Sequence, residues 1–425
     1  MKHPQLPKSA TRLSINLAGF AAGILAFLSL RGAEILPVHV LLVVAAIALP
    51  IVLLEAVFLK ERMPRPKNAY GEPDREEDSR IQRISIKLIG FVATLAAVAL
   101  VFWLLPEYHR TFYDPFYAFL QMIAVPFALL SVPYIAFVDS RMAEPHDSYW
   151  MMGNLITFRW KHVRAGVLGQ HALGWMVKGF FLPLMFVYLV NDLTWFSNAS
   201  FSGFFNRPFV ATYDVVWRII FCVDLSFTVT GYLLTLRLFD SDIRSTEPTF
   251  FGWAVALFCY QPFWSLFSRS YIAYETGMKW NLWLKDSPTL LVIWGCLILV
   301  VMAIYSLSTI TFGIRFSNLT HRGILTNGPY RFTKHPAYVS KNIGWWMVSV
   351  PFLSQMGAAD ALRHSALLLA LNIIYGLRAY TEERHLSRDP VYREYALWMD
   401  QHGMFRNVPF MRYSKRLSGF SPTGA

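Results

Sequence analysis

The stretch TLLVIWGCLILVVMAIYSLSTITFG, residues 289–313, contains no charged side chain. Backbone groups in the hydrocarbon of a bilayer must form their hydrogen bonds within the chain, so an apolar run of roughly 17–25 residues indicates a spanning helix. Nine further runs are comparably apolar, although Lys341, Asn342 and Arg378 interrupt the last two. The sequence therefore predicts an all-α integral membrane protein with about ten transmembrane helices. The predicted spans are 13–30, 35–59, 88–106, 115–138, 172–191, 215–236, 250–267, 289–313, 337–357 and 364–381.

The composition excludes a soluble protein. Of the 425 residues, 55% are hydrophobic and only 16% are charged, whereas soluble domains carry about 25% charged residues. The three cysteines, Cys222, Cys259 and Cys296, all lie in apolar runs, which argues against a disulfide framework or a cysteine zinc site. No HExxH motif, glycine-rich nucleotide loop or histidine pair at i,i+4 spacing occurs, so we expect no metal.

The distribution of positive charge predicts the topology. Of the 39 Lys and Arg residues, 28 fall in the N-terminal tail, the even-numbered loops and the C-terminal tail, against 7 in the other loops. This bias predicts that both termini are cytosolic. The net charge of +12 then belongs to the cytosolic face and suits anionic lipid head groups rather than nucleic acid. With no retention signal in the sequence, we expect a bacterial inner membrane, or the endoplasmic reticulum in a eukaryote.

Polar residues that could bind a ligand or take part in catalysis are concentrated after residue 311. Asn327-Gly328-Pro329 indicates a turn, and Lys334-His335-Pro336 then begins a helix, since proline suits the first helical turn. The free amide groups of that turn, beside Lys334 and His335, predict a site for a carboxylate or phosphate. The alternative is a helix start with interfacial Lys and Tyr anchors.

The last predicted span leaves the membrane with a polar face. Tyr375, Arg378, Glu382 and His385 are spaced to share one side of a helix, while Glu383 lies about 100° around it. Arg378 and Glu382 have the i,i+4 spacing of an ion pair. The alternative role of Arg378 is a cation that reaches the membrane surface and is neutralised there by its neighbour.

Asp389-Pro390 ends this helix, and an amphipathic stretch follows from Val391 to His402. It places Tyr392 and Tyr395 on one side, which fits either a helical lid or a helix on the membrane surface. Together these features suit S-adenosylmethionine (SAM). Its carboxylate requires a helix start or a cation, its ammonium requires a carboxylate, and its sulfonium favours aromatic faces.

At these positions the sequence resembles the superfamily of isoprenylcysteine carboxyl methyltransferases and phospholipid methyltransferases. The matching residues are Gly328 and Tyr330, Lys334-His335-Pro336-Ala337-Tyr338, Glu382-Glu383-Arg384-His385-Leu386, and Tyr392 through Tyr395. Two positions depart from the family pattern, because Lys334 replaces the usual arginine and Ser340 replaces a common glycine.

The resemblance implies that SAM binds between the last two spans and the C-terminal lid, and that a lipid or lipidated acceptor enters from the bilayer. It divides the chain into a transmembrane region at 1–310 and a methyltransferase-like hairpin with its lid at 311–425. Arg378 and Glu382 are the predicted catalytic residues. The predicted cofactor residues are Tyr330, Lys334, His335, Pro336, Tyr338, Glu382, Glu383, His385, Tyr392 and Tyr395.

The sequence also fits two other functions. Sterol reductases of the delta-14 type resemble the same region but bind NADPH, whose 2′-phosphate would need a basic cluster such as Arg384, Arg388 and Arg393. The second alternative is a non-catalytic protein that binds or transports lipid. Several acceptors fit methyl transfer: prenylated peptide, phospholipid, isoprenoid acid and quinone-like lipids. An amine acceptor would need a base, for which His335 and Glu383 are candidates.

Asp224, in the predicted span 215–236, is an intramembrane carboxylate. Such a group is a functional candidate, as a proton relay or a head-group contact. It fits equally well as a neutral, hydrogen-bonded packing residue.

Overall fold

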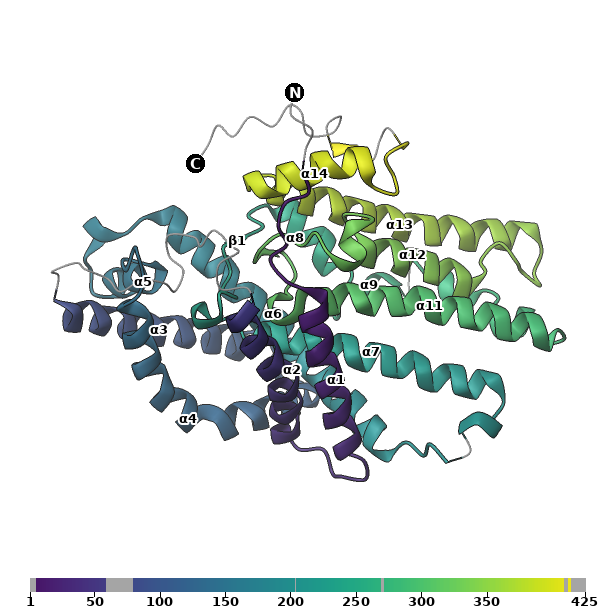
Figure 1. Cartoon of the computed structure of the whole chain (residues 1–425), viewed down its shortest axis with the longest axis horizontal. Helices are drawn as coiled ribbons and strands as arrows, with labels where there is room; N and C mark the ends of the chain where they lie inside the picture. Colours follow the sequence, from purple (N-terminus) through teal and green to yellow (C-terminus); the bar gives the residue numbers. More distant parts are fainter. Residues whose placement is uncertain (1–4, 59–78, 203, 269–270, 409–411, 414–425) are drawn as a thin grey trace.

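A computed structural model describes residues 5–58, 79–202, 204–268, 271–408 and 412–413. This part of the chain is almost entirely helical (Figure 1). Among the described residues, six helices are long and apolar enough to cross a membrane, which supports an integral membrane protein. They are α2 (Pro37–Phe58), α3 (Arg80–Leu104), α4 (Asp114–Asp139), α6 (Ala165–Asn198), α7 (Phe209–Leu233) and α11 (Pro288–Phe312).

The remaining elements are shorter or more polar. The other α-helices are α1 (Leu13–Ser29), α5 (Ser148–Ile156), α8 (Phe250–Leu257), α9 (Phe263–Ser268), α10 (Trp280–Trp283), α12 (Pro336–Ser349), α13 (Ala358–Leu386) and α14 (Pro390–His402). The 3₁₀ turns are η1 (Pro106–His109), η2 (Thr111–Tyr113), η3 (Trp160–His162), η4 (Phe204–Asn206), η5 (Arg237–Phe239), η6 (Tyr274–Thr276), η7 (Gly313–Arg315) and η8 (Gly328–Arg331). Two-residue strands, β1 (Ser245–Thr246) and β2 (Thr320–His321), pair antiparallel.

The prediction of ten spans is not confirmed. The predicted span 250–267 is two short helices, α8 and α9, because the chain turns at residues 258–262. Pro262 lies directly before α9, where its missing amide hydrogen interrupts no helical hydrogen bond. The predicted span 337–357 contains α12, whose 14 residues rise only about 21 Å against a hydrocarbon core of about 30 Å. α1 is apolar but has only 17 residues, and α13 is long enough but too polar to be among the six.

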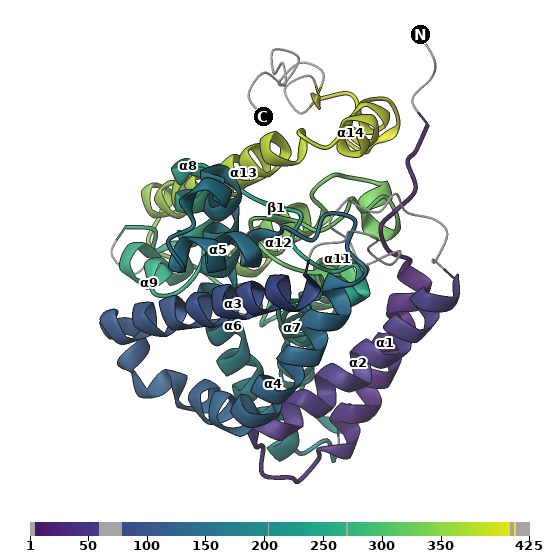
Figure 2. The ribbon, with the colours of Figure 1, turned by 90° about the vertical axis from the view of Figure 1, so that its left-hand side faces the viewer.

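The helices form two groups around α6 (Figures 1 and 2). α7, α11, α12 and α13 lie side by side at one end of the molecule, and α3, α4 and α5 lie at the other. α1 packs along α2, and the approach is so close that a Cβ at Gly19 would lie 2.6 Å from the carbonyl oxygen of Ile47. The largest buried apolar cluster includes Phe181 and Phe186 of α6 and Phe227 of α7.

The segment from η7 to Ile324 forms contacts with parts of the chain that come much earlier in the sequence. Ala10 donates its amide to the carbonyl of Ile324 at 2.8 Å, and Arg315 forms a buried ion pair with Glu55 at 2.7 Å. The β1–β2 pair joins Ser245 to His321. These contacts fix the loop between α11 and α12, which forms one wall of the site.

Candidate functional site

A large cavity lies where α11, α12, α13 and α14 meet the loop around β2 and the start of α8. It contains about 1370 Å³ of free space, including its open mouth. Nine of the predicted site residues line it: Tyr330, Lys334, His335, Tyr338, Arg378, Glu382, His385, Tyr392 and Tyr395. Of the predicted set, Pro336 and Glu383 do not. Motif residues that are far apart in the sequence therefore line the same cavity.

Pro336 and Glu383 do not line the cavity but support residues that do. Pro336 is the first residue of α12. Glu383 is 1% exposed, and its carboxylate lies 3.0 Å from both Nζ of Lys334 and Nε2 of His335. A buried carboxylate with two such partners holds both side chains in place. Because Glu383 already neutralises Lys334, an anion at the start of α12 would rely chiefly on the free amide groups of the first turn.

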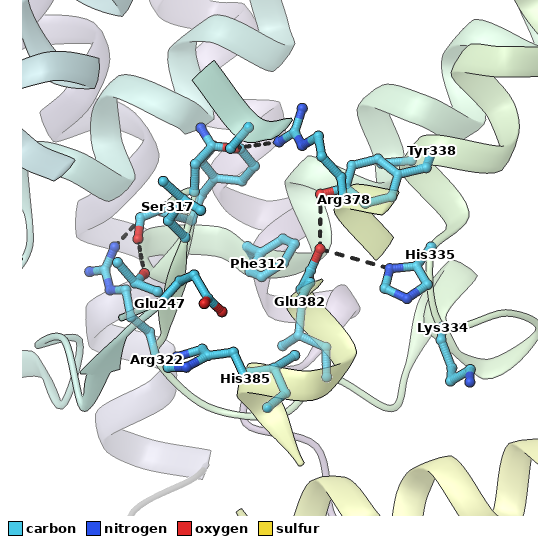
Figure 3. A pocket seen from close by; sticks show the side chains of 18 of the residues that line it. Glu247, Phe312, Ser317, Arg322, Lys334, His335, Tyr338, Arg378, Glu382 and His385 are labelled. Carbon is cyan, nitrogen blue, oxygen red and sulfur yellow. Dashed lines mark hydrogen bonds and ion pairs between the residues drawn. The ribbon is translucent and has the colours of Figure 1, made fainter. Parts of the chain in front are cut away.

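Glu382, the neighbour of Glu383, faces the cavity (Figure 3). Tyr338 donates its hydroxyl to Oε2 of Glu382 at 2.8 Å, and Nδ1 of His335 lies 3.8 Å from the same oxygen. The rings of His335 and Tyr338 are nearly parallel, with centroids 5.5 Å apart. The Glu382 side chain remains 40% exposed, so its negative charge is available to a cationic ligand.

Arg378 lies one turn before Glu382 and is 7% exposed. The ion pair that their spacing predicts is not formed. Instead, Nη2 of Arg378 donates to Oδ1 of Asn318 at 3.3 Å. Its guanidinium lies 5.0 Å from the ring centroid of Tyr338 and 5.4 Å from that of Tyr375. Within the described residues no carboxylate forms an ion pair with this cation, so its charge remains available to an anionic ligand.

The polar wall residues that the sequence analysis did not name as site residues include Glu247, Asn318 and Arg322. Arg322 follows β2 and donates to backbone carbonyls that include that of Gly231 near the end of α7 and that of Phe316 directly after η7. Burial, together with repulsion from Arg315, lowers the pKa of Arg322 to about 9. The only sequence signal was the polar run RFSNLTHRG after residue 314, and nothing in it indicates β pairing with residue 245.

The wall formed by α11 and α12 contains Tyr305, Thr309 and Lys341. Tyr305 donates its hydroxyl to Oδ2 of Asp224 at 2.7 Å, and Thr309 donates to Oδ1 at 2.5 Å. Nζ of Lys341 lies 3.4 Å from the Tyr305 hydroxyl. Asp224 thus stands behind the wall and orients two hydroxyl groups that face the cavity.

α14 supplies the tyrosines expected of it. Asp389 caps the helix by accepting the amide of Val391 at 2.7 Å, and Tyr392 and Tyr395 are buried toward the cavity. Burial raises the pKa of both phenols well above the usual value, so both are neutral donors. Tyr395 donates to the carbonyl of Tyr330 at 2.5 Å, whereas the Tyr392 hydroxyl has no hydrogen-bond partner among the described residues.

His385, near the end of α13, also lines the cavity. Its Nε2 lies 3.2 Å from Oγ of Ser245, and Nδ1 has no partner among the described residues. Burial lowers the pKa of His385 to about 4, so the imidazole is neutral at physiological pH.

The arginines considered for a 2′-phosphate lie elsewhere. Arg384, Arg388 and Arg393 do not line the cavity. Nη2 of Arg384 donates to Oγ1 of Thr249 at 2.6 Å, and Nη1 of Arg393 donates to the carbonyl of Ser387 at 2.9 Å. The structure therefore provides no basic cluster of these three residues at the site.

Across the part of the chain that the structure describes, no group of three or more His, Cys, Asp or Glu side chains is placed to hold a metal ion. Neither a curated protein nor a solved structure matches the chain. A family model does match its C-terminal region, over a segment that starts in α11 and ends just after α13. Residues 289–388 match the isoprenylcysteine carboxyl methyltransferase (ICMT) family, which confirms the resemblance inferred from the sequence of this region.

Proposed function

We propose that the protein transfers a methyl group from SAM to a lipid or lipidated acceptor held in the membrane. The observation that carries this proposal is the convergence of the motif residues of the matched region on one cavity. There Glu382 and Arg378 present opposite charges that are not paired with each other. A cationic cofactor and an anionic acceptor would each find a complementary partner.

The wall chemistry fits SAM. Glu382 would accept hydrogen bonds from the α-ammonium, and the free amide groups at the start of α12 would bind the carboxylate. Tyr330, Tyr338 and Tyr392 line the cavity, and a ring face of any of them would attract the sulfonium. The unpartnered Tyr392 hydroxyl and His385 Nδ1 are buried polar atoms that a polar ligand would satisfy.

Arg378 would hold the acceptor. A buried guanidinium without a carboxylate partner favours a carboxylate or phosphate, which it can bind through two parallel hydrogen bonds. SAM supplies a methyl group already activated on sulfur. The acceptor's anionic oxygen forms the new bond to that carbon while the carbon–sulfur bond breaks, its electron pair stays on sulfur, and no proton is transferred.

The chain's own part is to align the acceptor oxygen and to remove its water, which is worth several kcal/mol in well-oriented systems. An anionic acceptor is favoured over an amine because Arg378 presents to the cavity a positive charge that no carboxylate neutralises among the described residues. Of the two bases predicted for an amine acceptor, Glu383 lies behind the wall, whereas His335 lines it, with Nε2 3.0 Å from Glu383.

Isothermal titration of purified full-length protein with SAM, its demethylated product S-adenosylhomocysteine, and NADPH tests the proposal. We expect saturable binding of the first two and no binding of NADPH. Binding of NADPH in place of SAM would instead assign a reductase, and binding of none of the three would assign a lipid-binding or transport protein.

A further inference from the structure

Glu247 is a buried carboxylate that the proposed chemistry leaves unused. It comes from the short segment between β1 and α8, outside the matched region 289–388. It is 3% exposed and lines the cavity. Any role in ligand binding would bring a residue of the preceding, unmatched region into the site.

The backbone of Glu247 is fixed on both sides. Its amide donates to the carbonyl of Leu319 at 2.8 Å, and its carbonyl accepts Nε1 of Trp253 at 2.8 Å. Gly252 leaves room for the side chain, because a Cβ there would lie 2.4 Å from Cγ of Glu247. The carboxylate is therefore held in one position before any ligand arrives.

The two carboxylate oxygens differ in their partners. Oε1 accepts the amide of Thr249 at 3.0 Å and also its hydroxyl, and Nη2 of Arg384 lies 3.4 Å away. These bonds account for a structural role at the start of α8. Oε2 is buried and has no partner among the described residues. A charged, buried oxygen without a donor costs free energy, and a donor on a ligand would recover it.

The position of Glu247 in the cavity indicates which end of the ligand would lie next to it. In Figure 3, Glu247 lies on the opposite side of Phe312 from Glu382, and Lys334 and His335 lie beyond Glu382 on that far side. If the amino-acid end of the donor is bound at Glu382 and the start of α12, its nucleoside end extends toward Glu247. A carboxylate that accepts the hydroxyls of a ribose is a common solution for nucleoside ligands.

The geometry points to Glu247 as the ribose-binding residue of the cofactor site, with Oε2 accepting a hydrogen bond from the 2′- or 3′-hydroxyl. This inference rests on the proposed use of SAM and deepens it. It makes the segment before α8, and the β1–β2 pair that positions it, part of the cofactor site.

The test compares two ligands on two proteins. S-adenosylhomocysteine and its 2′,3′-dideoxy analogue are titrated into the full-length wild type and into Glu247→Gln, with exposed Glu34→Gln as the matched control. We expect the wild type to bind the analogue about tenfold more weakly than the parent. Glu247→Gln should weaken the parent by a similar factor and leave the analogue unchanged.

Each failure has a separate meaning. Equal wild-type affinity for the two ligands overturns the inference without needing a variant, even if Glu247→Gln does not fold. Equal weakening of both ligands by Glu247→Gln also overturns it, since the residue would then act on another part of the ligand. Wild-type protein that binds neither SAM nor S-adenosylhomocysteine overturns the proposed function itself.

Discussion

Arg378 and Glu382 are one turn apart in α13, yet each is bonded to a different partner. Arg378 donates to Asn318 at 3.3 Å, and Glu382 accepts the hydroxyl of Tyr338 at 2.8 Å. Had they paired with each other, their charges would be largely cancelled. Because they are not paired, α13 presents both a cation and an anion to the same cavity. Two oppositely charged ligands would require this arrangement.

Replacing Arg378 with alanine should lower kcat/KM for an anionic acceptor by about a hundredfold, since a charge-assisted contact to the acceptor is lost. The affinity for SAM should change little, because the cation is assigned to the acceptor. Steady-state kinetics and SAM titration measure the two effects separately. Exposed Arg363→Ala, on the same helix, is the control. A variant that loses SAM affinity and acceptor turnover to the same extent would contradict this division of roles.

Glu382→Gln should weaken SAM binding by about tenfold or more, because a charged hydrogen bond to the ammonium becomes a neutral one. Calorimetry on the purified variant measures the change, with exposed Glu394→Gln of α14 as the control. Affinity equal to that of the wild type would remove Glu382 from the cofactor site.

Glu383→Ala should destabilise the fold more than any substitution at Glu382. The change leaves Lys334 and His335 without their shared carboxylate at a nearly buried position, and breaking a buried ion pair in this way costs roughly 3–5 kcal/mol. We expect a Tm lower by several degrees in a thermal melt in detergent. Lys334→Arg, which keeps the charge, should melt close to the wild type; the account of this cluster fails if Glu383→Ala does so as well.

Acid should destabilise the protein through His385. Its pKa is lowered from 6.5 to about 4, first by burial, against the attraction of Glu247. Because the unfolded chain takes up this proton near pH 6.5 and the folded chain only near pH 4, stability is full above pH 6.5 and falls as the pH drops toward 4. His385→Gln should have a flatter Tm profile than the wild type between pH 6.5 and 5. Parallel profiles would show that His385 is not the group responsible.

Asp224→Asn tests the carboxylate behind the wall formed by α11 and α12. An amide offers only one acceptor oxygen to the two hydroxyls of Tyr305 and Thr309, so one buried hydroxyl loses its partner at a cost of about 1–3 kcal/mol. We expect a lower Tm with SAM affinity retained. Intact stability combined with lost turnover would instead assign Asp224 to proton transfer.

The sequence predicts the transmembrane helices where apolar runs are unbroken. The ranges 35–59, 88–106, 115–138, 172–191, 215–236 and 289–313 each overlap one of the six apolar helices. The prediction is wrong at 250–267, because an apolar run does not reveal the turn at 258–262 that separates α8 from α9. Helix spacing within α13 also identifies the face that carries Arg378 and Glu382, both of which line the cavity.

Long-range contacts set the limit of sequence-based prediction. The i,i+4 rule predicts a pair between Arg378 and Glu382, but it takes no account of Asn318 and Tyr338, which reach the same face from other elements. Glu247 reaches the wall through a two-residue strand pair between residues 245–246 and 320–321. A ladder this short has no hydrophobic period, so only the folded structure places Glu247 near the matched region.

The most direct test of the central claim is the transfer of label from methyl-labelled SAM into lipid. Full-length protein reconstituted in vesicles of its native lipid extract is incubated with the labelled donor, and the organic phase is then counted and fractionated. We predict label in an organic-soluble product that Arg378→Ala and Glu382→Gln both abolish or strongly reduce. An organic phase without label from protein that binds SAM, or equal labelling by these variants, would contradict the account.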